Sequence, residues 1–149
     1  MLRITKQADY GIVLLTRFTG NGERSVHNAR DLAAETRLPL PTVSKILKAL
    51  ARDGLLLSHR GVKGGYSLAR PAREVSVADI IRALDGPIAM TECLDIEGSD
   101  CGIESCCPVR SNWARINRAV RLALAGIPLT EMVPVFSRPP RPMAAARRE

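Results

Sequence analysis

The sequence predicts a mainly α-helical chain with the winged helix-turn-helix fold, a two-stranded wing and a long C-terminal helix. Three observations predict this class. Three short helical patterns fill roughly the first fifty residues, a glycine-rich hairpin follows them, and a longer amphipathic pattern lies near the C-terminus. Three short helices followed directly by a basic hairpin are typical of a winged helix-turn-helix.

The three N-terminal helices are each predicted by apolar spacing and by residues that start or stop a helix. Residues 20–22 (Gly-Asn-Gly) stop the first helix. Asn28 can cap the second helix, with Asp31 near the positive end of its dipole. Pro41 begins the third, because proline in the first helical turn loses no hydrogen bond. The apolar positions are Ala8, Ile12, Leu15 and Phe18, then Leu32 and Ala33, then Val43, Ile46, Leu47 and Leu50.

The segments that follow are a hairpin, a well-capped helix, a loop and a long helix. Strand-like runs at 55–60 and 66–69 flank the glycine-rich turn. Ser76 and Asp79 predict a capping box, with Val75 stapled against Ile80. Residues 90–107 show no period and are expected to form a loop. The last helix carries one apolar stripe, formed by Trp113, Ile116, Val120 and Ala123.

The positive charge of the chain is concentrated in its N-terminal half. The formal net charge is +7, and residues 1–73 hold 13 Lys and Arg against 5 Asp and Glu. This distribution favours an acidic partner such as nucleic acid. No apolar run approaches the ~20 residues needed to cross a bilayer, and the start lacks a signal peptide's apolar core. We therefore expect a cytoplasmic protein without a membrane partner. No catalytic constellation is present, so we expect neither an enzyme nor a small-molecule substrate.

The third helix and the wing carry the residues that we expect to bind DNA. The second helix of a helix-turn-helix pair enters the major groove. There, small hydroxyls allow close approach, while lysines reach phosphates or guanine. Glycines in the wing allow a close approach to the sugar-phosphate backbone. The predicted DNA-binding residues are Thr42, Ser44, Lys45, Lys48, Arg60, Lys63, Gly64 and Gly65.

Four cysteines form the second candidate site. Cys93, Cys101, Cys106 and Cys107 have the spacing C-x7-C-x4-C-C, within an acidic segment that contains Glu92, Asp95, Glu97, Asp100 and Glu104. In the cytoplasm such a density favours metal ligands or redox groups over disulfides. The paired hooks of a zinc site are missing. Since adjacent cysteines rarely ligate one metal, three thiolates are expected to hold an iron–sulfur cluster, with Cys106 or Cys107 left over.

Other interpretations of the cysteines remain open. One is structural zinc, and another is thiol–disulfide sensing through the pair Cys106 and Cys107 or the pair Cys101 and Cys106. A thiol oxidoreductase is disfavoured, because the chain lacks a C-x-x-C motif in a βαβ unit.

The chain resembles a family of winged-helix iron–sulfur transcription regulators, the one typified by IscR, NsrR and RirA. The resemblance is carried by residues 2–6 and 8–10, by the wing at 60–68, and by a three-cysteine loop before the helix that bears Trp113. It extends to about Val133 and looks closest to the subgroup that regulates the Suf iron–sulfur assembly operon.

The resemblance implies a homodimer built on the long helix, with one cluster per subunit and a palindromic operator in double-stranded DNA. The family's thiolates fall on Cys93, Cys101 and Cys107, with Cys106 as the alternative ligand. Members similar to IscR place a histidine where this chain has Arg110, which cannot ligate. Nitric-oxide-sensing members use an acid near the partner's N-terminus, and Asp9 matches it. The cluster type is open, with 2Fe–2S favoured and 4Fe–4S possible.

These inferences together predict the organisation and the function of the chain. We expect a DNA-binding domain at 1–73, a connecting helix at 74–89, a cluster-binding loop at 90–107, a dimerisation helix at 108–133 assisted by 1–20, and a disordered tail at 134–149. The expected function is repression of Suf genes in response to cluster, iron or redox status. Sensing of nitric oxide or of thiol oxidation, or a structural zinc in place of the cluster, is the alternative.

Overall fold

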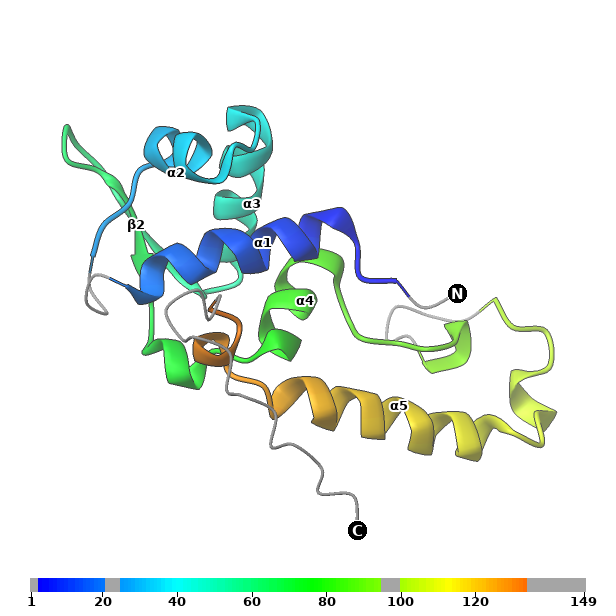
Figure 1. The fold of residues 1–149 in the computed structure, drawn as a ribbon. Helices are drawn as coiled ribbons and strands as arrows, with labels where there is room; N and C mark the ends of the chain where they lie inside the picture. Colours follow the sequence, from blue (N-terminus) through cyan, green and yellow to red (C-terminus); the bar gives the residue numbers. More distant parts are fainter. Residues whose placement is uncertain (1–2, 21–24, 95–99, 134–149) are drawn as a thin grey trace, which may run out of the picture.

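The structure is a computed structural model that describes residues 3–20, 25–94 and 100–133, and Figure 1 shows its fold. The element order confirms the predicted winged-helix class. The elements are α1 (Lys6–Thr16), η1 (Arg17–Thr19), α2 (Ala29–Thr36), α3 (Leu40–Arg52), β1 (Leu56–His59), β2 (Gly65–Leu68), η2 (Ala72–Glu74), α4 (Val77–Asp85), η3 (Glu92–Leu94), η4 (Glu104–Cys106), α5 (Arg110–Ala125) and η5 (Leu129–Glu131). The predicted helix stop at 21–22, the acids Asp95 and Glu97, and the predicted disordered tail lie outside the described residues.

The helix starts predicted from single residues are confirmed. The Asn28 side-chain oxygen accepts a hydrogen bond from the Asp31 backbone N–H at 2.8 Å, and Pro41 lies in the first turn of α3. Ser76 and Asp79 form a complete capping box at the start of α4. The structure adds one cap that the sequence analysis did not single out, because the Thr5 hydroxyl accepts a hydrogen bond from the Ala8 N–H at 3.1 Å.

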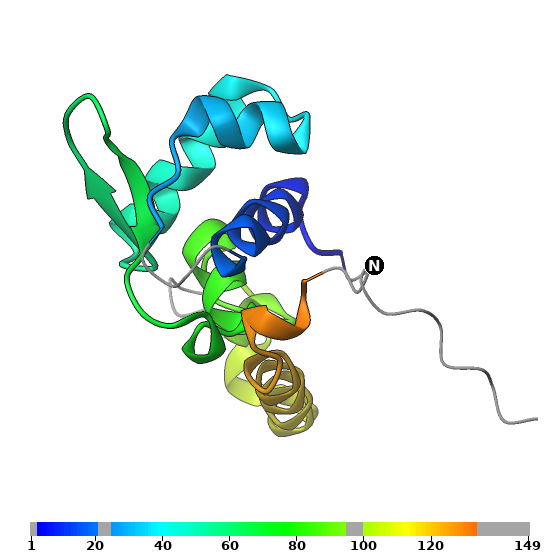
Figure 2. The ribbon, with the colours of Figure 1, turned by 60° about the vertical axis from the view of Figure 1, so that its left-hand side comes forward.

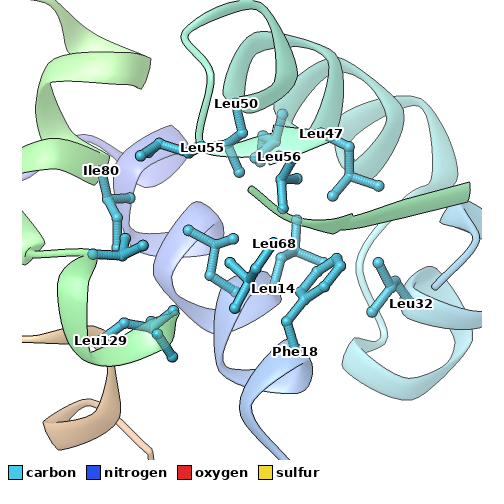
Figure 3. Packing of buried hydrophobic residues seen from close by; sticks show 14 of the residues in the cluster. Leu14, Phe18, Leu32, Leu47, Leu50, Leu55, Leu56, Leu68, Ile80 and Leu129 are labelled. Carbon is cyan, nitrogen blue, oxygen red and sulfur yellow. The ribbon is translucent and has the colours of Figure 1, made fainter. Parts of the chain in front are cut away.

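One apolar core joins the N-terminal helices, the wing and α4. Figure 3 shows Leu14 of α1 and Phe18 of η1 among leucines from α2, α3 and both wing strands. Ile80 of α4 and Leu129 of η5 are also fully buried in this cluster. The core therefore extends beyond the residues of the three-helix unit and fixes α4 to it.

The wing is a two-stranded antiparallel sheet that is itself tied to the chain before α2. Leu56 pairs with Leu68 at one end and His59 with Gly65 at the other. The backbone of His27 pairs with Tyr66, with both hydrogen bonds 2.8 Å long. A third segment thus braces the wing at its base.

The C-terminal end of α5 is anchored to the start of α4. The Val77 N–H donates to the Ile127 carbonyl at 2.9 Å, and the Leu129 N–H donates to the Val75 carbonyl at 2.7 Å. From this anchor α5 extends as a rod along one side of the molecule, with the wing at the opposite side (Figures 1 and 2). Of the helices in the described ranges, none combines the length and apolarity needed to span a membrane.

The apolar stripe predicted on the last helix does not pack into the core of its own chain. Trp113 and Ile116 are 37% and 44% exposed, and Ala123 is also exposed. The buried residue of α5 is instead the polar Asn117. The apolar stripe of α5 is therefore open to a partner outside the chain.

The capping box of α4 generates a stability prediction. Burial raises the pKa of Asp79, but hydrogen bonds from Ser76 and the charges of Arg70 and Arg82 outweigh it, so its pKa lies below 3.8. Ser76→Ala removes the cap and should lower the free energy of unfolding by ~1 kcal/mol. Urea denaturation measures the change. Ser58→Ala, at an exposed wing position, should leave the unfolding midpoint almost unchanged.

The depressed pKa of Asp79 fixes the direction of the pH dependence. A carboxylate whose pKa is lower in the folded state stabilises fully above its ordinary pKa, and this contribution is lost as the pH falls through the folded value. Asp79→Asn should therefore reduce the loss of stability below about pH 4, measured as urea midpoints across an acid pH series. An unchanged acid profile would contradict this role of Asp79.

Candidate nucleic-acid interface and thiol site

α3 presents its predicted DNA-binding residues on the side away from the core. Lys45 and Lys48 are exposed, and Thr42 and Ser44 are half-buried. The helix can expose them because its buried side is filled by Val43, Ile46, Leu47, Ala49 and Leu50. Two flexible cations and two short hydroxyls on one helix provide donors for phosphates and for base edges.

The turn into α3 contains a basic residue that the sequence analysis missed. Arg37 follows α2 directly, with φ of 57°, and its side chain is exposed. Left-handed backbone is uncommon for a residue other than glycine. Since this turn separates the two helices of the helix-turn-helix, Arg37 adds a positive charge just before the recognition helix. A lone arginine between two helical patterns carries no distinctive sequence signal.

The wing carries its cations at the turn. Arg60 and Lys63 are exposed, and Val62 between them is fully open to solvent. Lys63 and Val62 follow Gly61, whose φ of 104° is rarely adopted by residues with a side chain. The wing therefore extends a basic hairpin tip with an apolar side chain at its end.

Gly64 and Gly65 have a role inside the wing that the sequence did not reveal. A Cβ atom on Gly65 would lie 2.4 Å from the His27 carbonyl oxygen, and one on Gly64 would lie 2.5 Å from the His59 carbonyl oxygen. Both glycines are thus required by the close approach of the protein's own backbone. Their contact with DNA stays a prediction.

The two histidines are held by neighbours within the fold. His27 Nε2 lies 2.9 Å from the Ser25 hydroxyl, and its ring meets Phe18 edge-on, with the centroids 4.8 Å apart. His59 Nε2 lies 2.7 Å from the hydroxyl of the buried Ser67. These contacts position the bracing segment and the wing strands.

The four cysteines lie on the segment that leads into α5. None of the four forms a disulfide; Cys106 is exposed and the other three are half-buried. Cys93 Sγ lies 3.3 Å from the Thr91 hydroxyl, and Cys106 Sγ contacts the Ile103 carbonyl at 3.6 Å. In Figure 1 this segment lies at the end of α5 that is far from the wing.

Two interactions tie this segment to α5. Arg110 forms an ion pair with Glu104 at 2.8 Å, so the residue at the family's histidine position is engaged with a carboxylate. The Asn117 side-chain oxygen accepts a hydrogen bond from the Met90 N–H at 3.0 Å. Both ends of the cysteine segment are therefore held by the same helix.

The thiols are not gathered around one point. Within the described ranges there is no group of three or more His, Cys, Asp or Glu side chains that could hold a metal ion. The donor chemistry nevertheless fits an iron–sulfur cluster, because soft thiolates are its usual ligands. To bind one, this segment would have to draw its thiols together.

Asp9 lies apart from the thiols of its own chain. It is exposed on α1 and lines a hollow of about 390 Å³. The other residues around this hollow, none of them cysteine, are Ile4, Lys6, Ile12, Val77, Ile81, Leu124, Ile127 and Met132. A ligand role for Asp9 would therefore require the partner subunit, as the resemblance implied.

Comparisons with known proteins agree with this geometry. The profile of the Rrf2 family, described as an iron-dependent transcriptional regulator, matches residues 4–134. The Mycobacterium tuberculosis protein Rv1287, which carries the name of an HTH-type transcriptional regulator, is 39% identical over 59% of this chain. That match spans 55% of the relative's own length.

Solved structures show the same fold over most of the chain. The structure of CymR, the global cysteine regulator of B. subtilis, superposes with a TM-score of 0.68 at 27% identity, covering 89% of this chain and 97% of CymR. The IscR of T. potens gives a TM-score of 0.59 at 26% identity, covering 89% of this chain and 86% of that one. These similar proteins are regulators rather than enzymes.

The close approach at Gly65 generates a prediction about the wing. Gly65→Ala should force the wing away from residues 25–28 and lower the free energy of unfolding by about 1–3 kcal/mol, because the new methyl group would overlap the His27 carbonyl. Thermal or urea denaturation tests it. Gly20→Ala is the matched control, since a Cβ there meets nothing within 4 Å. Equal stability of the two variants would contradict the brace.

Proposed function

The chain belongs to the Rrf2 family of transcriptional regulators, and on that premise we propose that it is a homodimeric, DNA-binding repressor controlled by an iron–sulfur cluster. The single observation that carries this proposal is that one chain joins a basic winged helix-turn-helix unit to a thiol-rich segment bound to α5. The proposed duty is control of Suf iron–sulfur assembly genes in the cytoplasm, in response to cluster, iron or redox status.

Binding to duplex DNA is supported by the exposed cations of α3 and the wing. In the proposed complex the start of α3 enters the major groove, where Thr42 and Ser44 approach base edges and the lysines reach phosphates. Arg60 and Lys63 carry the wing to the adjacent backbone, and Gly64 and Gly65 shape that hairpin. Much of the binding free energy comes from the release of counterions from the DNA, so the affinity depends on the salt concentration.

A homodimer is supported by the apolar stripe of α5. Large apolar side chains that stay exposed along one helix indicate an interface. Pairing two copies through this helix would place two recognition helices on successive major grooves of a palindromic operator.

The cluster is proposed to be held by Cys93, Cys101 and Cys107, with Cys106 as the alternative third thiolate. The partner subunit's Asp9 is the proposed fourth ligand, because Arg110 is engaged with Glu104 and has no lone pair to donate. A bound cluster, proposed as 2Fe–2S with 4Fe–4S as the alternative, would supply a redox-sensitive, oxygen-labile cross-link between these thiolates. In this proposal, the Met90–Asn117 hydrogen bond transmits the ordering of the cysteine segment to α5. The position of α5 in the dimer then sets the spacing of the two DNA-binding units.

A second candidate is regulation by thiol oxidation without a cluster. The observation that favours it is the exposed Cys106 beside Cys107, in a segment whose donors are not gathered. The solved oxidised form of Staphylococcus aureus CymR, with 29% identity and a TM-score of 0.64, is similar in fold. In that case oxidation of two thiols to a disulfide by a peroxide would replace cluster binding as the switch.

The DNA interface generates a salt-dependence prediction. Lys45→Gln and Lys48→Gln should each weaken duplex binding and lower the slope of log K against log salt by about 1, because each removes one phosphate contact. Fluorescence anisotropy with the DNA upstream of the gene that encodes this chain measures both the affinity and the salt slope. Lys6→Gln is the control, because it removes the same charge at an exposed residue of α1, outside α3. Slopes that fall equally in all three variants would contradict the assignment to α3.

The cluster generates a prediction with a spectroscopic readout. Protein purified without oxygen should be brown, contain iron and acid-labile sulfide, and absorb light at roughly 400–500 nm. Cys93→Ala, Cys101→Ala and Cys107→Ala should lose the iron, and Cys106→Ala should retain it. The partner ligand is tested by Asp9→Ala, which should shorten the lifetime of the cluster in air.

The same preparation separates the alternatives. Cluster-loaded and metal-free protein should differ in operator affinity by about 5–150-fold. Equal affinities would end the regulatory proposal, and so would protein that contains neither iron nor sulfide after reconstitution. Colourless protein with stoichiometric zinc would support the structural-zinc alternative, and a peroxide-induced disulfide that changes DNA binding would support thiol sensing.

A further inference from the structure

A hollow of about 690 Å³ lies between α4 and α5, on the face that joins the reading head to the long helix. Its lining includes three arginines, one buried amide and apolar side chains, among them Ile88, Leu94 and Leu122. Hollows of 300–1,000 Å³ (approximately) with apolar walls and a few convergent polar groups are typical of small-molecule sites. Neither the reading head nor the proposed cluster uses this hollow.

Asn117 supplies the buried polar group of the hollow. Its residue is only 7% exposed, and its side-chain oxygen already accepts the Met90 N–H. The side-chain nitrogen of Asn117 has no hydrogen-bond partner among the described residues. Every fully buried side-chain nitrogen or oxygen in those residues does have a partner, so this nitrogen is not fully buried. The Asn117 NH2 group is therefore an accessible donor in the hollow wall, and its acceptor must come from a ligand or water.

The charge of the lining is strongly positive. Arg82 makes only long contacts, 3.8 Å to Asp53 and 3.6 Å to Asp79. Arg118 and Arg121 also line the hollow, and neither forms an ion pair within the described ranges. The one carboxylate of the lining, Asp79, is already held by Ser76 and by Arg70 at 2.8 Å. Two arginines without an ion pair among the described residues, Arg118 and Arg121, and the Asn117 amide donor therefore line the same hollow.

We propose that this hollow binds a small organic carboxylate. The carboxylate group would accept hydrogen bonds from the Asn117 amide and from both Arg118 and Arg121, since guanidinium groups form strong, charge-assisted hydrogen bonds with carboxylates. The apolar part of the ligand would lie against Ile88 and Leu122. The presence of cationic and apolar side chains in one lining favours an organic acid over inorganic phosphate.

Part of the hollow's lining lies on the side of α5 away from the apolar stripe that is proposed for dimerisation. At 100° per residue, Arg118, Leu122 and Ala125 lie about 160° around the helix from Ile116, Val120 and Ala123 of the apolar stripe. Asn117 and Arg121 lie between these two sets, so a partner seated on the stripe would leave the Arg118 side of the hollow open.

The ligand would be placed to influence the cysteine segment. Leu94 lines the hollow and directly follows Cys93. The Met90 N–H donates to the oxygen of the Asn117 amide, whose nitrogen is the proposed donor to the ligand. Occupation of the hollow would therefore stiffen the start of the segment that carries the thiols. This effect on DNA binding rests on the proposed function, whereas ligand binding itself does not.

The test is calorimetric titration of full-length, metal-free protein without DNA, using phthalate, adipate and citrate as probes. At least one should bind saturably, and inorganic phosphate and the neutral analogue benzamide should bind at least tenfold more weakly. Arg118→Gln and Arg121→Gln should each raise the Kd about tenfold or more. Arg115→Gln, the same change on the exposed surface of α5 outside the hollow, should leave the Kd unchanged.

Asn117→Asp is the second diagnostic variant, because it keeps an acceptor for Met90 but removes the amide donor and adds a repelling charge. It should abolish binding while circular dichroism and the elution volume stay those of the wild type. The proposal is overturned if no carboxylate binds saturably below about 10 mM, or if Arg115→Gln weakens binding as much as Arg118→Gln. Phosphate that binds as tightly as the carboxylates overturns the organic-acid assignment.

Discussion

The attachment of α5 at its C-terminal end is the constraint on which the rest of the structure depends. Leu129 is fully buried in the same core as Phe18 and Ile80, and two backbone hydrogen bonds join this region to Val75 and Val77. Hydrophobic burial and satisfied backbone groups thus fix one end of the rod to the reading head. Along its remaining length α5 buries only Asn117, so it is available to a second subunit on one side and to the cysteine segment at its far end.

This arrangement separates two regions of opposite character and links them mechanically. The basic head presents α3 and the wing, whereas the acidic thiol segment lies at the other end of α5 (Figure 1). Direct electrostatic influence across such a separation is screened in physiological salt. Any signal from the thiols must therefore travel through contacts, and these include the Glu104–Arg110 ion pair and the Met90–Asn117 hydrogen bond.

The sequence predicted much of the candidate DNA interface and less of the thiol site. Lys45 and Lys48 are exposed as expected, because the apolar spacing of α3 dictates which side is buried. The sequence predicts that Gly64 and Gly65 contact DNA, and the structure shows that the close approach of the His59 and His27 carbonyl groups also requires their lack of a side chain. The likeness of Cys93, Cys101 and Cys107 to a cluster-binding loop rests on spacing, which does not establish how the thiols converge. Arg37 and the hollow around Asn117 carry no sequence signal at all.

The sequence by itself determined the local elements of this protein. Caps at Asn28 and Ser76, the proline at the start of α3 and the glycine-rich wing act over a few residues, so a linear pattern contains the physics that forms them. Only the tertiary structure decided what each face touches. It showed that the apolar stripe of α5 faces outward while polar Asn117 is buried, because burial depends on which distant segments, here Met90 and α4, arrive against the helix. That choice is a sum of long-range contacts, which periodicity along the chain does not encode.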